Sequence, residues 1–125
     1  MLGAADAIAT IAVRNLSAAA EFYEGKVGLK KLASEETMGV HMYQSGKSTL
    51  LVYESQFAGT NKATAATWAV DDVDGEVREL KKKGVTFERY DFPDVTHEGD
   101  VHVFGKQRNA WFKDPDGNIL AVVSK

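Results

Sequence analysis

The chain has 125 residues, of which 44% are hydrophobic and 26% charged, a balance typical of one globular domain with a single core. Its formal net charge of −3 combines both signs without a basic stripe, so we expect no nucleic acid as a partner. No apolar stretch approaches membrane-spanning length, so we expect no membrane partner either. The absence of cysteine excludes disulfides, thiolate metal ligands and a cysteine nucleophile.

The first half of the chain predicts a strand, a helix and three further strands. Residues 7–13 form a short apolar run rich in branched side chains, which indicates a strand buried on both faces. A helix is predicted over 16–27, with Ser17 as its N-cap and Gly28 as its stop. The three strands that follow are predicted at 29–35, 39–45 and 48–54. Small and polar residues make 55–64 the candidate linker.

The second half predicts the same kinds of element. A strand over 65–70 leads into a helix over 72–83, capped by Asp71 or Asp72. A strand follows at 85–90, and a final hairpin pairs 109–113 with 119–123. The segment Asp114-Pro115-Asp116-Gly117-Asn118 between them has Asp, Pro and Gly at the positions that a tight turn favours.

The two halves repeat one unit. Val13-Arg14-Asn15-Leu16 with its helix recurs about 56 residues later as Val70-Asp71-Asp72-Val73, and two copies in one small domain usually enclose a cavity. The turn glycines Gly46 and Gly117 lie further apart, so the second unit carries about 15 additional residues, which must fall in 91–106. This polar insert is either a lid or ligand-binding loop, or a surface loop or dimer contact.

These motifs resemble the vicinal oxygen chelate superfamily, which includes glyoxalase I, bleomycin-resistance proteins, fosfomycin-resistance transferases and extradiol dioxygenases. The residues that carry the resemblance are Val13 to Leu16, Phe22-Tyr23, Gly28-Leu29, Val70 to Val73, Leu80, Gly84-Val85 and Trp111 to Asn118. The resemblance implies an α+β fold in which two βαβββ modules, about 7–56 and 64–125, form one curled mixed-sheet cup within a single domain of residues 1–125. It also implies a homodimer.

The superfamily is named after a divalent metal held by His and Glu side chains inside the cup. The resemblance places those ligand positions at Ile8, Leu51, Ala65 and Ala121, all of which are apolar here. Aliphatic side chains cannot donate a lone pair to a metal, so we expect no metal and no other cofactor. We therefore do not expect the lyase, transferase and dioxygenase activities of the superfamily, because each of them needs the metal as a Lewis acid or an oxygen-binding centre. The remaining precedent is the bleomycin-resistance type, which sequesters a drug-like molecule unchanged.

Strand alternation predicts which side chains face the cup. Counted from the four metal positions, this alternation turns Thr10, Leu51, Tyr53 and Thr67 inward, and the resemblance implies the same for Asn109 and Trp111. The expected ligand-binding residues are Thr10, Leu51, Tyr53, Thr67, His102, Phe104, Asn109 and Trp111. Tyr53 and Trp111 would be its aromatic walls, although large amphipathic aromatics also fill cores, whereas Trp68 should face the helices. We therefore expect a binding protein for a small molecule, such as an antibiotic or an aromatic metabolite. The chain begins without the charged and apolar regions of a secretory signal, which favours the cytoplasm.

The histidines leave an enzyme of the same fold as an alternative. A relocated metal site could use His41, His102 and Glu98, since imidazole and carboxylate suit zinc, iron and nickel. A metal-free acid–base enzyme could use His102 as its catalytic group, with Glu98 or Asp100. If His102 and Phe104 form the rim of the cup, ligand affinity should change between about pH 6 and 7, the ordinary range of an imidazole.

Overall fold

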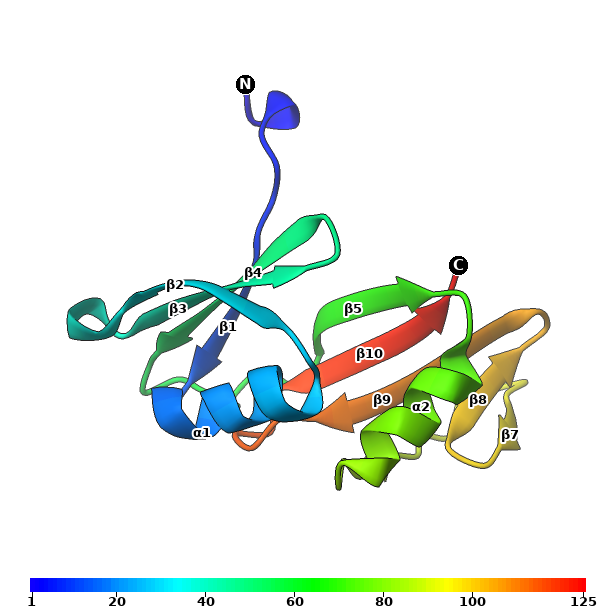
Figure 1. The fold of residues 1–125 in the computed structure, drawn as a ribbon. Helices are drawn as coiled ribbons and strands as arrows, with labels where there is room; N and C mark the ends of the chain where they lie inside the picture. The colour runs from blue at the N-terminus through cyan, green and yellow to red at the C-terminus, as the bar shows by residue number, and fades with distance from the viewer.

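A computed structural model describes the backbone of residues 1–125 and the side chains of 1–35 and 37–125. The elements of the first half are the short 3-10 turn η1 (Leu2–Ala4), β1 (Ala9–Val13), α1 (Leu16–Ala20), the π-helical segment η2 (Glu21–Lys26), β2 (Lys30–Glu35), η3 (Glu36–Met38), β3 (Val40–Ser45) and β4 (Ser48–Glu54). Their strands form one sheet in the order β1-β4-β3-β2, in which β1 and β4 are parallel and the other pairs antiparallel (Figure 1).

The second half forms a larger sheet. Its elements are β5 (Thr64–Val70), α2 (Val73–Lys82), β6 (Phe87–Glu88), β7 (Thr96–Glu98), β8 (Val101–Phe104), β9 (Gln107–Lys113) and β10 (Ile119–Ser124). The strand order is β5-β10-β9-β8-β7, and the short β6 also pairs with β9. The strands β5 and β10 are parallel, as β1 and β4 are, which confirms the α+β fold with two modules. No helix in the described chain is long and apolar enough to cross a membrane.

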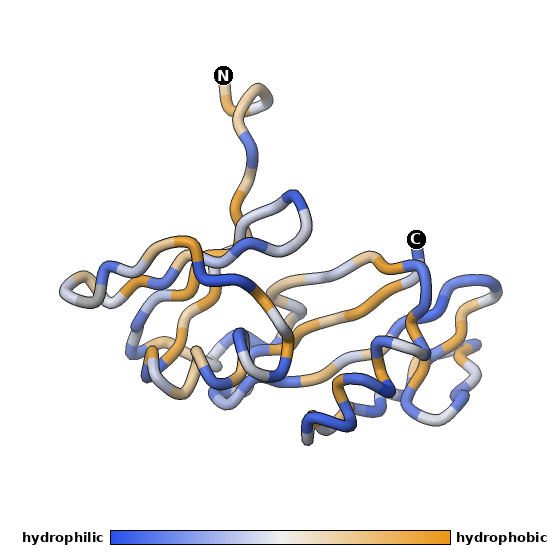
Figure 2. The backbone as a smooth tube through the Cα atoms, in the orientation of Figure 1, coloured by the Kyte–Doolittle hydropathy of each residue, from blue (hydrophilic) through white to orange (hydrophobic). Residues whose placement is uncertain are grey.

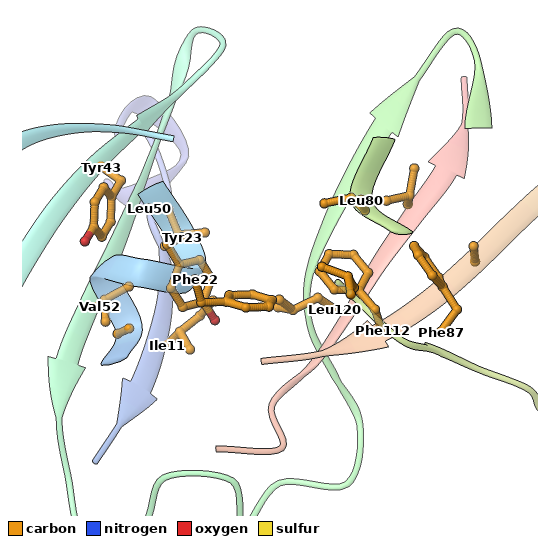
Figure 3. Packing of buried hydrophobic residues seen from close by; sticks show 14 of the residues in the cluster. Ile11, Phe22, Tyr23, Tyr43, Leu50, Val52, Leu80, Phe87, Phe112 and Leu120 are labelled. Atoms are coloured by element: carbon orange, nitrogen blue, oxygen red, sulfur yellow. The ribbon is translucent and has the colours of Figure 1, made fainter. Parts of the chain in front are cut away.

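One hydrophobic core lies on the helix side of both sheets. The helix α1 packs on β4, and α2 packs on β9 and β10 through Val73, Val77 and Leu80. Figure 2 shows hydrophobic and strongly hydrophilic residues together on α2, as expected for a helix with one buried face. The two modules meet where the rings of Phe22 and Phe112 lie 6.2 Å apart between the sheets (Figure 3).

The opposite face of each sheet carries no helix. Thr10 on β1 is exposed while its neighbour Ile11 is buried, so this strand is buried on one face and not on two. The strands β1 and β5 lie side by side, but the two sheets remain separate and open (Figure 1). The chain by itself thus presents two uncovered sheet faces, called the open faces below, instead of one curled cup.

The turn at 114–118 locks the two modules together. The Tyr23 hydroxyl donates to Asp114 Oδ2 at 2.7 Å, and the Asn118 side chain donates both to Asp114 Oδ2 and to the carbonyl of Ala12 in β1 at 2.8 Å. The backbone amides of Asp116 and Asn118 donate to the other carboxylate oxygen of Asp114. This turn, recognised in the sequence only as a hairpin connection, therefore also fixes the relative position of the modules.

The helix start and the insert differ from the sequence predictions. Asn15, not Ser17, caps α1, because Asn15 has extended backbone and its Oδ1 accepts from the amide of Ala18. Asp72 caps α2 as predicted. Residues 91–106 are not irregular throughout, since they contain the hairpin β7–β8. Strand β6 is short because β8 occupies the place beside β9 from His102 onward.

Candidate ligand-binding site

Alternation on β8 and β9 directs two sets of side chains to opposite faces of the second sheet. Ala110 and Phe112 are buried in the core on the helix side, so Asn109 and Trp111 occupy the open face. Val101 and Val103 likewise pack against the core, which leaves His102 and Phe104 on the open face beside Trp111. The predicted grouping of these four residues on one face is therefore confirmed.

The insert covers this part of the open face with aromatic rings. The aromatic cluster consists of Tyr90, Phe92, His97, His102, Phe104 and Trp111. The ring of Phe92 lies 5.7 Å from those of Phe104 and Trp111, while Tyr90 meets Trp111 edge-on at 5.5 Å. Edge-on and tilted contacts at such distances are favourable between aromatic rings. The insert therefore extends the sheet as a hairpin and also lays Phe92 across the face beside it.

Two histidines hold the backbone of Tyr90. The Tyr90 amide donates to His102 Nε2 at 2.9 Å, and His97 Nε2 donates to the Tyr90 carbonyl at 2.9 Å. The two imidazole rings lie 4.7 Å apart. Because His102 Nε2 accepts a hydrogen bond, it carries no proton, and in the neutral ring the proton is on Nδ1. The position of Tyr90 thus depends on a neutral His102.

His102 is fully buried and is not a rim residue as predicted. Burial lowers its pKa below the ordinary value, and the neighbouring His97 lowers that pKa further. Backbone contacts near Asn109 and Asp100 oppose the shift only in part. The expected pH window of about 6 to 7 therefore moves downward, and His97 is a second imidazole in the same cluster.

A pocket of about 380 Å³ opens beside the aromatic cluster. Its lining residues are Lys62, Ala63, Thr64, Tyr90, Phe92, Trp111 and Ile119. The indole of Trp111 reaches from β9 across β10 to β5, since its Nε1 donates to Thr64 Oγ1 at 3.2 Å. The hydroxyl of Tyr90 is buried and has no hydrogen-bond partner among the described residues. The pocket is thus mainly apolar, with few polar groups.

The positions that would hold the superfamily's metal do not fit one. Ile8 is 46% exposed, and Leu51 and Ala65 are half-buried aliphatic side chains. Ala121 lies directly opposite Trp111 on β10 and is 2% exposed, because the indole crosses the strand there. Within the described side chains, no three His, Asp or Glu residues come together as metal ligands. The donor set that metal chemistry requires is absent from these positions.

Of the eight predicted binding residues, Trp111 lines this pocket, whereas His102, Phe104 and Asn109 share its face of the sheet without lining the pocket, and the other four lie elsewhere. Thr10 and Leu51 are paired neighbours on the open face of the first sheet, and Tyr53 is 37% exposed on the same sheet. Thr67 is exposed on β5, opposite Ala121. Sequence reasoning missed Lys62, Tyr90 and Phe92. The alternation of Tyr90 and Phe92 across the start of the insert was the signal available for the aromatic pair.

The structure does not assemble the alternative sites. His41 is buried on the helix side, where its Nδ1 lies 3.2 Å from the Tyr43 hydroxyl, whereas His102 is on the open face of the other sheet. Burial and the adjacent Glu24 raise the pKa of Tyr43. Glu98 pairs with Arg108 at 2.9 Å and Asp100 with Lys81 at 2.7 Å. The relocated metal site, and the pairing of His102 with Glu98 or Asp100, were therefore wrong interpretations.

Trp68 has the structural position predicted for it. Its ring stacks near Phe112 on the helix side, and its Nε1 donates to Ser45 Oγ of the first module at 2.8 Å. A second pocket, of about 280 Å³, lies beside it between α2 and the end of the first helix. The two tryptophans of the chain therefore lie on opposite faces of the second sheet, so the fluorescence of each one reports on a different face.

The family model described as Glyoxalase/Bleomycin resistance protein/Dioxygenase superfamily matches residues 6–122, and the chain belongs to this superfamily. A similar solved structure is TnmS3, an antibiotic binding protein from Streptomyces sp. CB03234, with TM-score 0.69, 20% identity and 97% of each chain covered. Lactoylglutathione lyase from Agrobacterium tumefaciens has TM-score 0.72 and 17% identity, over 96% of this chain and 92% of that one.

The fosfomycin resistance protein FosX from Listeria monocytogenes has TM-score 0.72 and 14% identity, again over 96% of this chain and 92% of its own. At these identities the likeness shows the fold alone. A comparison with curated protein sequences finds no match.

Proposed function

We propose that this member of the superfamily is a cytoplasmic binding protein that holds a small, partly aromatic molecule, such as an antibiotic or an aromatic metabolite, and releases it unchanged. The observation that carries the proposal is the pocket of about 380 Å³ walled by Tyr90, Phe92 and Trp111. Ligand sites are typically concave and mostly apolar, with a few polar groups that fix orientation. The similarity to an antibiotic binding protein and to a fosfomycin resistance protein supports this class of function.

Binding without a metal is part of the proposal. Its support is the aliphatic side chain at each of the four positions, together with the Trp111 indole across Ala121. Elemental analysis of protein purified without a histidine tag should find no stoichiometric zinc, nickel, iron or manganese. A full equivalent of metal that survives dialysis against a chelator would contradict this part of the proposal.

A homodimer is the second part of the proposal. Large apolar side chains are exposed beside both open faces, namely Ile8 just before β1, Tyr53 on β4 and Phe92 in the insert. A second copy could cover these faces and bring Thr10, Leu51 and Tyr53 to a shared cavity. Sedimentation equilibrium at micromolar concentration should give twice the monomer mass, and a monomer at that concentration would contradict the dimer.

The direct test of binding is a small-molecule library screened by thermal shift, because a ligand at 100 times its Kd should stabilise the protein by about 2.7 kcal/mol. Hits should quench tryptophan fluorescence in Trp68→Phe, which retains Trp111, and not in Trp111→Phe, the matched control. Trp111→Ala and Phe104→Ala should each weaken binding by about 1–3 kcal/mol. Quenching that persists in Trp111→Phe would place the ligand elsewhere.

Mass spectrometry of each hit after incubation separates a binder from an enzyme. We expect the ligand to be recovered unchanged, since His102 is buried and its Nε2 is held by the Tyr90 amide. Turnover that disappears in His102→Gln would instead establish acid–base catalysis.

A further inference from the structure

Two of the aromatic walls of the pocket beside Trp111 come from one irregular segment. Tyr90 and Phe92 line that pocket, and both lie in residues 90–95, called the strap below, which connect β6 to β7. Phe92 is 42% exposed, and Asp94 has left-handed backbone with a φ of 61°, which residues other than glycine rarely adopt. The conformation of the strap therefore depends on the contacts that hold it from outside.

Two imidazoles hold the strap at the backbone of Tyr90, and they do so in opposite roles. The carbonyl of Tyr90 can only accept, so His97 carries a proton on Nε2 and keeps this bond whether its ring is neutral or charged. The amide of Tyr90 can only donate, so His102 Nε2 must carry no proton. Protonation of His102 sets two N–H groups against each other and removes one of the two bonds.

The surroundings of His102 offer a charged imidazole no compensation. His102 is fully buried, and the groups that face it from the neighbouring elements are His97 on β7, Tyr90 and Phe92 in the strap, and Asn109 and Trp111 on β9. The carboxylates of the region are paired elsewhere or exposed, namely Glu88 with Lys113, Glu98 with Arg108, Asp100 with Lys81, and the exposed Asp91 and Asp94. Burial and then His97 lower the pKa of His102, so its neutral form predominates at neutral pH.

We propose that His97 and His102 are positioning residues of the ligand pocket, which act through the backbone of Tyr90, and that protonation of His102 releases the strap together with the bound molecule. The pocket then loses its walls at Tyr90 and Phe92, while Trp111 keeps its place on β9 through its bond to Thr64. The protein holds its ligand at neutral pH and gives it up in acidic surroundings. This inference rests on the proposed function and adds a mechanism of release.

The expected pH dependence follows from one proton that competes with the ligand. Affinity is complete where His102 is neutral and should fall about tenfold for each pH unit below the pKa of His102 in the free protein. Because burial and His97 lower that pKa, the fall should begin below the ordinary imidazole value of about 6.5.

The clamp itself is tested without a ligand. Long-range proton–nitrogen NMR spectra at pH 7.5 should show His102 Nε2 as an unprotonated nitrogen and His97 Nε2 as a protonated one. Between pH 7.5 and pH 5 the protection of the Tyr90 amide against hydrogen exchange should fall at least about tenfold, after correction for the intrinsic exchange rate. The amide of Val52, buried in the central strand β4, should keep its protection over the same range.

The release is tested with 2-naphthylmethanol, a neutral aromatic probe whose own charge does not change between pH 5 and pH 8. It is titrated at several pH values into the parent chain by calorimetry and into Trp68→Phe by fluorescence, and circular dichroism verifies the fold at each pH. We expect affinity to be constant above the pKa of His102 and to fall about tenfold per pH unit below it.

Three variants assign the pH dependence to its residues. His102→Gln has a side-chain oxygen that can accept from the Tyr90 amide but takes up no proton, so its affinities at pH 7.5 and pH 5 should agree within about threefold. His97→Gln removes the neighbouring imidazole that lowers the pKa of His102, so the fall in affinity should begin at higher pH. His41→Gln, the matched control in the first module, should keep the pH dependence of the parent chain.

The outcomes separate the release mechanism from the function on which it rests. Equal affinity at pH 7.5 and pH 5, or a pH dependence that is unchanged in both His102→Gln and His97→Gln, overturns the mechanism and leaves aromatic binding in place. A probe that fails to bind at pH 7.5 counts against the proposed function, and the Tyr90 amide then decides the inference alone. Protection of that amide that is the same at pH 7.5 and pH 5 overturns the clamp.

Discussion

Removal of one buried hydroxyl should show how strongly the turn at 114–118 holds the two modules together. Tyr23 is fully buried in the first module, and its hydroxyl donates to Asp114 Oδ2 at 2.7 Å. Asp114 is 5% exposed, so its carboxylate depends on the hydrogen bonds that it receives from the protein. Tyr23→Phe removes one of these bonds and keeps the aromatic ring.

The expected loss follows from the kind of bond. A hydrogen bond to a charged group contributes about 1.5–3 kcal/mol, and the ring remains to fill its site, so we expect a loss of about 2 kcal/mol. For a domain of this length, 1 kcal/mol corresponds to about 4 °C in Tm, so Tyr23→Phe should melt about 8 °C lower. Calorimetry or circular dichroism at pH 7 measures this difference.

The same hydrogen bond should also affect how the stability of the fold changes with pH in the alkaline range. Burial and Asp114 raise the pKa of Tyr23, so the folded state holds this proton after an unfolded tyrosine, with its pKa of about 10, has released it. The stability that the protonated Tyr23 contributes is therefore fully present below about pH 10 and is lost as the pH rises further. The free energy of unfolding of Tyr23→Phe should fall less above pH 10 than that of the parent chain.

The matched control is Tyr53→Phe, which removes a hydroxyl from an exposed ring on the open face. This control should melt within about 1 °C of the parent chain, as ordinary surface substitutions do. Equal melting temperatures for Tyr23→Phe, Tyr53→Phe and the parent chain would refute the view that the Asp114 network stabilises the fold.

Three further changes have defined outcomes. Burial and His97 lower the pKa of His102, so the stability that its neutral form contributes should be fully present above about pH 6.5 and lost as the pH falls below that value. The melting temperature of His102→Gln should therefore fall less between pH 7.5 and pH 5 than that of the parent chain. Asn15→Ala should cost about 1 kcal/mol in urea unfolding, and an equal loss in Ser17→Ala would contradict the assigned cap. Gly59 has positive φ, and a Cβ added there would collide with the backbone carbonyl of Asp116 in the turn at 114–118. Gly59→Ala should therefore unfold at a clearly lower urea concentration. An unchanged urea midpoint would show that the turn can move aside at little cost.

The local elements of the fold could be read from the sequence because their causes are local. Helix and strand periodicity, the Asp72 cap and the turn residues at 114–118 depend on neighbours within a few positions. The duplicated pattern then identified the superfamily, alternation placed His102 and Phe104 on one side of their strand, and the pattern of the superfamily turned Trp111 to the same face. The absence of metal-binding side chains at the four ligand positions also follows from residue identity alone.

Only the tertiary structure decided how distant segments meet. Sequence spacing could not place Tyr90 between two histidines, because these contacts depend on how the hairpin β7–β8 docks on β9. The same docking buries His102 and lowers its pKa, which residue type cannot predict. Lys62 reaches the pocket from the segment before β5, far from the insert in sequence. Burial and the pairing of charges are properties of the packed molecule, and the chemistry of the pocket therefore becomes visible only in three dimensions.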